Sequence, residues 1–288
     1  MHSCAHKGVF NKYALDYYWN FLHFCAYFVG TFASICHRHR RNMAYLVVPK
    51  QILAKISYLC RMNKILAKYY KENLILWISF FAIWAIGVAY GFTGSQVETH
   101  IELNSFHTPF WDTFFKYITE FGGNLPFILI GIFMLFNLRD GLFLLLGQGI
   151  CSLITQIFKY TCCHPRPLTL FNSLGIDLPP TVEGVHIWDA FNSFPSGHTS
   201  CVFVFFAGIA AILPYRYRFI QIFLVVFAFV TGFSRIYLSQ HFLADVLFGS
   251  LIGMISTVIT YVIVYYKERG NINLIRTGLS KLGLIPNS

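Results

Sequence analysis

The composition of this 288-residue chain excludes an ordinary soluble domain. Apolar residues make up 56 % of it and charged residues only 12 %, whereas soluble domains carry roughly 25 % charged residues. The net charge of +10 is compatible with nucleic-acid binding, but the basic residues cluster as the orientation of a membrane protein requires. We therefore expect an integral membrane protein that binds no nucleic acid.

Two amphipathic stretches come first in the chain. Residues 13–36 are aromatic and apolar with a narrow polar stripe, and residues 45–71 carry most of their basic side chains on one helical face. The first pattern favours a helix in the membrane surface, with an additional span as the alternative. The second favours a helix on an anionic inner leaflet, with an ordinary solvated face as the alternative. Residues 1–73 are predicted to form a basic, membrane-associated extension.

Six apolar segments follow, with lengths that suit helices crossing a bilayer. They are residues 74–92, 125–138 with a backward extension from 124 to 114, 141–158, 199–213, 219–233 and 242–266. The sequence thus predicts an all-α, polytopic membrane helical bundle with six core transmembrane helices at 74–266. A basic cytoplasmic tail is expected at 267–288.

The basic residues lie mostly on one side of this predicted bundle. If the stretch before the first span is cytoplasmic, sixteen of the 22 Lys and Arg residues fall on the cytoplasmic side. Only Lys116, Lys159, Arg166 and Arg235 fall on the opposite, outer side. Because basic loops are retained in the cytoplasm, we expect both termini to be cytoplasmic.

Three of the four outer cations belong to short motifs at the ends of predicted spans. Residues 159–167 end the third span, residues 195–198 precede the fourth, and residues 234–245 join the fifth to the sixth. The alternation of spans places all three motifs on one face of the membrane. Their lysine, two arginines and two histidines need an anionic ligand there, and phosphate is the natural one because guanidinium groups bind its oxygens well.

Each motif also has a local physical reason to act on phosphate. His241 and Asp245 are four residues apart, so on a helix the carboxylate can take the Nδ1 proton and leave Nε2 free as a nucleophile or base. Ser196 can cap the next helix, whose amides near Gly197 can point at an anion. His198 then stands beside the phosphate as a general acid. A structural His–Asp pair that ties helices together is the alternative for 241 and 245.

The three motifs resemble the signature motifs of the type-2 phosphatidic acid phosphatase superfamily, over about residues 74–266. The resemblance implies an integral-membrane lipid phosphatase that needs no metal and no cofactor. His241 would attack phosphorus and become a phosphohistidine, Asp245 would orient it, and His198 would protonate the leaving oxygen and then activate water. The groups that would hold the equatorial phosphate oxygens are Lys159, Arg166, Ser196, Gly197 and Arg235.

The expected substrate is a phosphomonoester or pyrophosphate of a lipid, hydrolysed at the periplasmic face of a bacterial inner membrane. Undecaprenyl pyrophosphate, phosphatidylglycerophosphate, phosphatidic acid and lipid A are the candidates. One alternative is a lipid phosphotransferase that passes the same phosphate to another lipid. A haloperoxidase with vanadate as cofactor is a second, although enzymes of that branch are soluble. A transporter or scaffold without chemistry is a third, and it would not need His198, His241 and Asp245.

Several other residues on the predicted outer side are weaker candidates. His164 is a possible substrate contact, and His186, Trp188 and Asp189 either line the entrance to the site or pack a loop. A cluster of aromatic residues indicates an interfacial belt, with the floor of a lateral lipid entrance as the alternative. Its members are Phe106, Phe110, Trp111, Phe114, Phe115 and Tyr117.

Overall fold

The computed structural model describes residues 50–265. The predicted helix at 13–36 and the predicted tail at 267–288 lie outside the described residues. The chain divides into two compact units, Met1–Lys64 and Ile65–Ser288, and helix α2 (Lys50–Glu72) contains the boundary between them. This helix lies within the stretch predicted to be amphipathic, and the placement of its basic face on a membrane stays a prediction.

The second unit is built of helices, and residues 65–265 contain no β-strand. After α2 the helices are α3 (Leu74–Gly91), α4 (Gln96–Leu103), α5 (Pro109–Ile118), α6 (Leu125–Phe136), α7 (Leu138–Cys162), α8 (Pro167–Leu174), α9 (Gly197–Ile212), α10 (Ile220–Tyr237) and α11 (Leu243–Tyr265), with short 3-10 helices η1 (Thr119–Gly122) and η2 (Tyr215–Tyr217). Within the described residues, the six predicted apolar segments fall on α3, α6 with α5 and η1 as its backward extension, α7, α9, α10 and α11. The all-α prediction is therefore confirmed.

The predicted number of spans is confirmed only in part. Helices α3, α7, α10 and α11 are long and apolar enough to cross a membrane, and α5 with η1 and α6 would make a fifth span with a bend of 49°. Helix α9 is apolar but has only 16 residues. Among the described residues the structure thus supports four to five candidate spans.

Two boundaries differ from the prediction for local reasons. Helix α7 begins at Leu138 and not at 141, because the side chain of Asn137 accepts a hydrogen bond from the Asp140 amide at 3.2 Å and so caps the helix. The backward extension of the second segment is helical but broken. The break lies at Gly123, whose φ and ψ of −97° and −119° are not helical.

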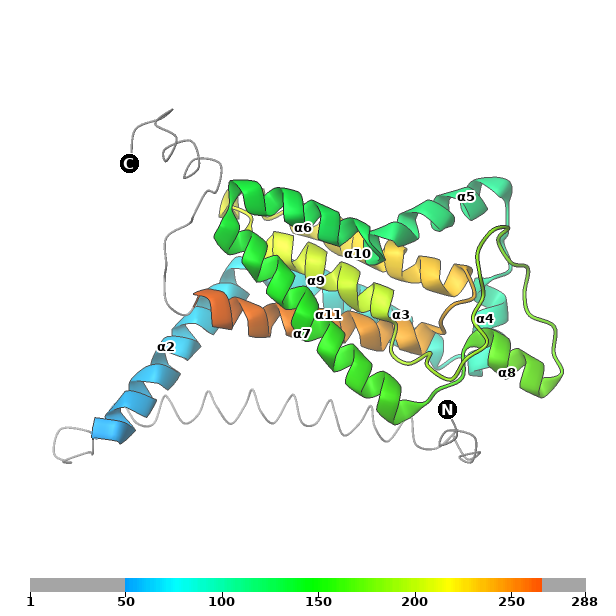
Figure 1. Ribbon diagram of the computed structural model, residues 1–288, viewed down its shortest axis with the longest axis horizontal. Coiled ribbons are helices and arrows are strands. Elements are labelled where there is room, and N and C mark those ends of the chain that lie inside the picture. The colour runs from blue at the N-terminus through cyan, green and yellow to red at the C-terminus, as the bar shows by residue number, and fades with distance from the viewer. Residues whose placement is uncertain (1–49, 266–288) are drawn as a thin grey trace. The chain divides into compact units, whose positions relative to one another are not determined.

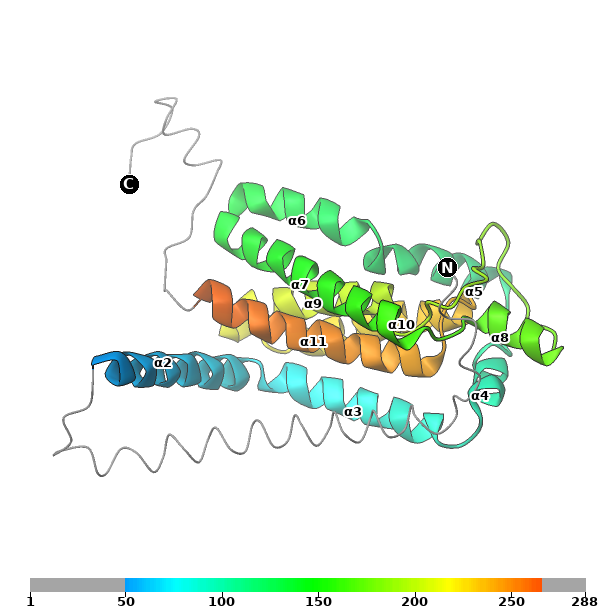
Figure 2. The ribbon, with the colours of Figure 1, turned by 60° about the horizontal axis from the view of Figure 1, so that its bottom comes forward.

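Helix α9 lies at the centre of the bundle and contacts α7, α10 and α11, as Figures 1 and 2 show. Glycines allow this close approach. A Cβ atom added at Gly249 would lie 2.6 Å from the Ser196 carbonyl oxygen, and one at Gly253 would lie 2.5 Å from the Phe203 Cβ. Small residues let helix backbones come together in this way inside membrane proteins. The beginning of α9 is thereby held against the first turns of α11.

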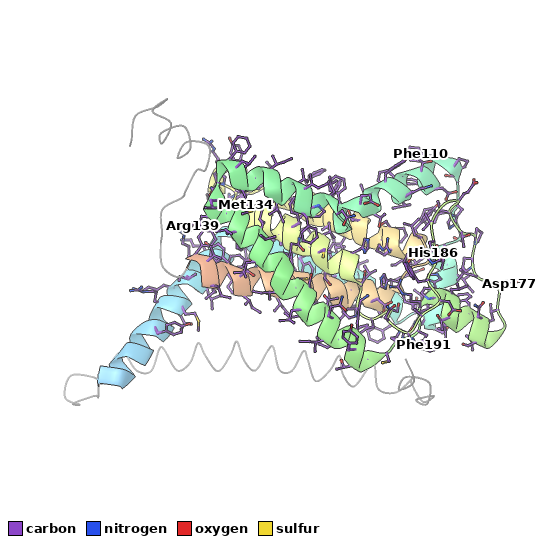
Figure 3. The ribbon with its side chains drawn as sticks, viewed as in Figure 1. Phe110, Met134, Arg139, Asp177, His186 and Phe191 are labelled. Carbon is purple, nitrogen blue, oxygen red and sulfur yellow. The ribbon has the colours of Figure 1, made fainter. Side chains whose placement is uncertain are left out.

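The two ends of the bundle carry different residues. In Figure 3, Met134 and Arg139 lie at one end, and Asp177, His186 and Phe191 lie at the other. Helices α4, α5 and α8 gather at the second end in both ribbon views (Figures 1 and 2). We call this second end, where α7 finishes and α9 begins, the site end.

The glycine contacts predict a large difference between two similar substitutions. Gly253→Ala should lower stability by about 1–3 kcal/mol, because the new methyl group would overlap Phe203 and the backbone of α9. The matched control is Gly149→Ala in α7, where nothing lies within 4 Å of an added Cβ. Thermal unfolding of the detergent-purified variants measures the difference. Equal melting temperatures for the two variants would contradict the packing described here.

Candidate active site

The three sequence motifs meet at the site end of the bundle. The Ser196 amide donates to the Asp245 carbonyl at 3.0 Å, which joins the second motif to the third. Arg166 Nη1 donates to the Gln240 carbonyl at 3.3 Å, which joins the first motif to the third. His198 interacts electrostatically with groups of all three motifs, namely Lys159, Arg166, Arg235 and His241. The structure therefore brings together all the residues that the sequence predicts for the site.

His241 and Asp245 are linked through a serine that the sequence analysis missed. The direct distance between His241 Nδ1 and Asp245 Oδ2 is 3.5 Å, which is long for a hydrogen bond. Ser193 Oγ donates to Asp245 Oδ2 at 2.5 Å and lies 3.3 Å from His241 Nδ1. A hydroxyl that donates to the carboxylate accepts from Nδ1–H. This chain of contacts fixes the imidazole tautomer and leaves Nε2 without a proton.

The local backbone places both ends of this chain of contacts. Asp245 lies in the first turn of α11, and its Oδ2 also accepts the amide of Phe242 at 2.9 Å. His241 precedes the helix, and its amide donates to the Arg235 carbonyl at 3.1 Å. The histidine is therefore held between the end of α10 and the beginning of α11.

His241 is buried, with 2 % of its surface exposed. Burial lowers the pKa of its imidazole from 6.5 to about 4, and the neighbouring Asp245 opposes this shift only in part. The ring is therefore neutral at pH 7. A neutral imidazole with a free Nε2 is the form that can attack an electrophile.

The beginning of α9 forms the floor of the site. Ser196 Oγ caps the helix by accepting the Thr199 amide at 3.4 Å, and it also contacts Thr199 Oγ1 at 2.8 Å. The predicted cap is thus present, and it occupies the hydroxyl that was also expected to bind phosphate. The first amides of a helix have no partners within it and favour an anion. His198 follows one residue into the helix, and a Cβ added at Gly122 would lie 2.6 Å from its carbonyl oxygen.

Two arginines lie buried around this floor, and among the described residues neither is in direct contact with a carboxylate. Arg166 donates to Asn192 Oδ1 at 2.8 Å and to Gln240, and Arg235 donates to Thr119 Oγ1 at 2.8 Å. Each arginine is only 8 % exposed. Within residues 65–265 no carboxylate forms an ion pair with either guanidinium group. Buried charges without a counter-ion are unfavourable, so this arrangement suits a site that receives an anion.

Ser193, Asn192, Thr119 and Gln240 were not predicted from the sequence. Ser193 lies two residues before the second motif, and this proximity is the only signal that pointed to it. Thr119 gave no signal, because it reaches Arg235 across 116 positions of the chain.

His186, Trp188 and Asp189, the weaker candidates from the sequence, hold the loop between α8 and α9 in place. Asp189 accepts a hydrogen bond from Thr169 at 2.7 Å, the His186 carbonyl accepts one from Gln240 at 2.9 Å, and the Trp188 ring packs on His186. These contacts agree with the loop-packing interpretation. The His164 ring packs edge-on against Phe242.

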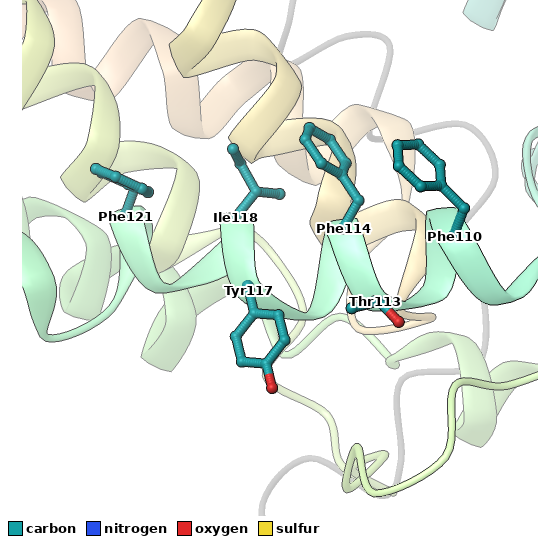
Figure 4. Close-up of a pocket in the computed structure, with 6 residues that line it drawn as sticks. All are labelled: Phe110, Thr113, Phe114, Tyr117, Ile118 and Phe121. Atoms are coloured by element: carbon teal, nitrogen blue, oxygen red, sulfur yellow. The ribbon is translucent and has the colours of Figure 1, made fainter.

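Phe110, Phe114 and Tyr117 of α5 are among the residues that line an open groove of about 520 Å³, whereas Phe115 of the same helix is buried. Figure 4 shows Phe110, Phe114, Ile118 and Phe121 on one side of the helix, and Tyr117 points to the other side. The groove runs along α5 into η1, the 3-10 helix whose Thr119 binds Arg235. Its wall is apolar, which suits the acyl chains of lipids.

Comparisons with known proteins point to one family. The family model of the PAP2 superfamily matches residues 140–269. The lipid A 4′-phosphatase of Bacteroides thetaiotaomicron is 27 % identical over 167 residues, which cover 55 % of this chain and 73 % of that protein. Phosphatidylglycerophosphatase B of Bacillus subtilis is 32 % identical over 151 residues, which cover 48 % and 68 %.

Two solved structures are also similar. LpxE of Aquifex aeolicus has 26 % identity and a TM-score of 0.49, with 57 % of this chain and 92 % of that chain covered. A PAP2-type phosphatidylglycerolphosphate phosphatase from Bacillus subtilis has 25 % identity and a TM-score of 0.49, with 69 % and 98 % covered.

In class, then, this chain is an integral-membrane lipid phosphatase, and hence a hydrolase. It belongs to the PAP2 superfamily. The resemblance that the three motifs indicated is therefore confirmed.

From the contacts of Ser193 we predict that removal of its hydroxyl lowers the catalytic rate. Ser193→Ala should lower kcat by about tenfold to 100-fold, because His241 would lose the contact that fixes its tautomer and orientation. The matched control is Ser173→Ala, which removes an exposed hydroxyl that bonds only the Leu170 carbonyl. Steady-state assays of phosphate release measure both. Unchanged kcat in Ser193→Ala would contradict a role for the bridge.

From the burial of His241 we predict the pH at which kcat/KM falls on the acid side of its pH profile. Its folded-state pKa lies below the usual 6.5, so His241 stays neutral and reactive until the pH approaches about 4. We expect kcat/KM, corrected for the ionisation of the substrate phosphate as measured by ³¹P NMR, to be retained at pH 5.5. A corrected limb near pH 6.5 would contradict the burial of the reacting imidazole.

Proposed function

We propose that this protein hydrolyses a phosphomonoester or pyrophosphate on a lipid by way of a phosphohistidine at His241. The observation that carries the proposal is the pair of buried guanidinium groups, Arg166 and Arg235, which form no direct ion pair with a carboxylate within residues 65–265. They lie with Lys159 around a neutral histidine whose Nε2 is free. A phosphate group would neutralise these cations and bring an electrophilic phosphorus to the histidine.

In the first step His241 Nε2 attacks phosphorus, and the bond from phosphorus to the lipid oxygen breaks. His198 gives its proton to that leaving oxygen, and the lipid departs as an alcohol or a lipid monophosphate. Asp245 and Ser193 hold the imidazolium-like ring through Nδ1. Lys159, Arg166, Arg235 and the amide of Gly197 stabilise the negative equatorial oxygens.

In the second step His198 takes a proton from water, and the resulting hydroxide attacks the phosphorus of phosphohistidine. The bond between nitrogen and phosphorus breaks, inorganic phosphate leaves, and His241 returns to its neutral form. The fixed cations supply the positive charge that the reaction requires, and we propose that no metal or cofactor takes part.

The membrane arrangement that we propose has six core spans, with α9 as the shortest and the pair α5–α6 as a bent one. The site end would face the periplasm of a bacterial inner membrane, and the termini would lie in the cytoplasm. The proposal is supported by the distribution of Lys and Arg along the sequence and by the position of Arg139 at the end opposite the site (Figure 3). The basic face of α2 would contact an anionic inner leaflet.

Lipid A and phosphatidylglycerophosphate are the substrates that the names of the two relatives favour. Undecaprenyl pyrophosphate and phosphatidic acid remain candidates, because the phosphate site described here contacts only the group that they all share. The apolar groove of α5 supports a substrate with acyl chains.

The test is release of inorganic phosphate by the detergent-purified protein from a panel of these four lipids, with and without a chelator. We expect release from at least one lipid, resistance to the chelator, and a loss of about 10³-fold or more in His241→Ala. The matched control is His186→Ala, whose exposed side chain belongs to the same end of the bundle, and it should stay within twofold of the parent protein.

Labelled substrate extends the same experiment to the intermediate. With a lipid that has a good leaving group, His198→Ala should accumulate an acid-labile, base-stable phosphoprotein, because its second step lacks the base that activates water. The label should be absent in His241→Ala. Phosphate release that is equal in the parent and His241→Ala proteins would refute the mechanism. Appearance of a second phosphorylated lipid in place of free phosphate would show that the protein is a lipid phosphotransferase.

A further inference from the structure

The turn that carries His241 has an unusual backbone. Helix α10 ends with the Ser239 amide bonded to the Ile236 carbonyl and the Gln240 amide bonded to the Arg235 carbonyl, each at 2.9 Å. This is the hydrogen-bond pattern that usually ends on a glycine. Here a serine occupies the left-handed position, with φ of 48°, a conformation that residues with a side chain rarely adopt. The turn therefore needs support from its surroundings.

That support comes from α4. His100 in α4 and Asn104, the residue at the C-terminal cap of this helix, lie one helical turn apart, and both are 1 % exposed. His100 Nε2 lies 3.3 Å from Ser239 Oγ, and Asn104 Nδ2 donates to the Ile236 carbonyl at 3.2 Å. Both contacts are made to the left-handed turn. The first is to the side chain of Ser239, and the second is to the backbone carbonyl of Ile236.

His100 bonds Ser239 through a neutral ring. Asn104 Nδ2 gives its two hydrogens to the carbonyls of His100 and Ile236, at 3.0 and 3.2 Å, so the Ser239 hydroxyl is the hydrogen-bond partner of His100 Nε2. Burial lowers the pKa of His100 to about 4, which keeps the ring uncharged at neutral pH.

His100 also contacts the residue that follows the reacting histidine. Its ring packs edge-on against Phe242, with 5.2 Å between ring centroids. Helix α4 therefore touches the chain on both sides of Gln240 and His241, at Ser239 and at Phe242. Neither His100 nor Asn104 lies in the three motifs or within residues 140–269, which the family model matches.

We propose that His100 and Asn104 of α4 are positioning residues that hold the Ser239 turn and thereby set the place of His241 Nε2. The inference rests on the proposed role of His241 as nucleophile. A displacement of about 1 Å at a reacting atom can reduce a rate by roughly 10²-fold. The phosphate cradle depends less on α4, because Arg235 is held by Thr119 and Arg166 is held partly by Asn192. Loss of the brace should therefore slow the chemical step more than it weakens phosphate binding.

The test compares three substitutions in the full-length, detergent-purified protein. His100→Phe keeps an aromatic ring against Phe242 but removes the nitrogen that bonds Ser239. His100→Gln restores a hydrogen-bonding group, because its amide can donate to or accept from the Ser239 hydroxyl. The matched control is Ile101→Ala, which changes an exposed side chain at the next position of the same helix.

We expect His100→Phe to lower kcat by about tenfold or more with KM within threefold, and His100→Gln to recover most of that loss. The single-turnover rate of His241 phosphorylation should fall as much as kcat does. The inhibition constant of inorganic phosphate should stay within threefold, since it reports the cradle of cations. The number of phosphate-binding sites per protein, measured with the same probe, corrects each rate for misfolded enzyme.

The inference would be overturned if His100→Phe behaved like Ile101→Ala, or if its loss of kcat disappeared once rates were expressed per phosphate-binding site. It would also be overturned if His100→Gln were as slow as His100→Phe. A parent protein that released no phosphate from any lipid would instead refute the proposed function.

Discussion

Arg166 and Arg235, two guanidinium groups buried near one another without a direct ion pair among the described residues, impose the main constraint on the rest of the structure. Burial of such charges is unfavourable unless hydrogen bonds and opposite charges compensate for lost solvation. Neutral acceptors from Thr119, Asn192 and Gln240 provide the hydrogen bonds. The carboxylates of Asp245 and Glu120 act on Arg166 and Arg235 only without direct contact, and in the proposed function the lipid phosphate supplies the anion that touches both arginines.

The packing of the helices brings the ends of segments that are far apart in the sequence together around these arginines. Gly249 and Gly253 let α11 approach α9 so closely that the Ser196 amide bonds the carbonyl of Asp245. The carboxylate, the helix N-terminus and the reacting histidine consequently form one rigid unit. A short α9 at the centre of the bundle places its positively polarised end inside the protein, where a phosphate group gains most from it.

Residues outside the three motifs complete the site by supporting the motif residues. Ser193 relays the contact between His241 and Asp245, and His100 with Asn104 supports the turn from the opposite side. The family model matches residues 140–269, which contain all three motifs. His100, Asn104 and Thr119 lie before this range, so the supports that they provide come from outside the matched region.

The sequence by itself determined the helical class and the six apolar segments, and it predicted that the three motifs lie together at one end of the bundle, because hydropathy and the alternation of helices can be obtained from local patterns. It also determined the family, since the motifs are specific combinations of residues. Only the tertiary structure decided that Ser193 joins His241 to Asp245, 52 positions away, and that His100 meets Ser239, 139 positions away. The break in the second span was likewise invisible, because a glycine at 123 is compatible with a continuous helix. An apolar pattern states which side of a helix is buried, but it carries no information on which partner that side will meet.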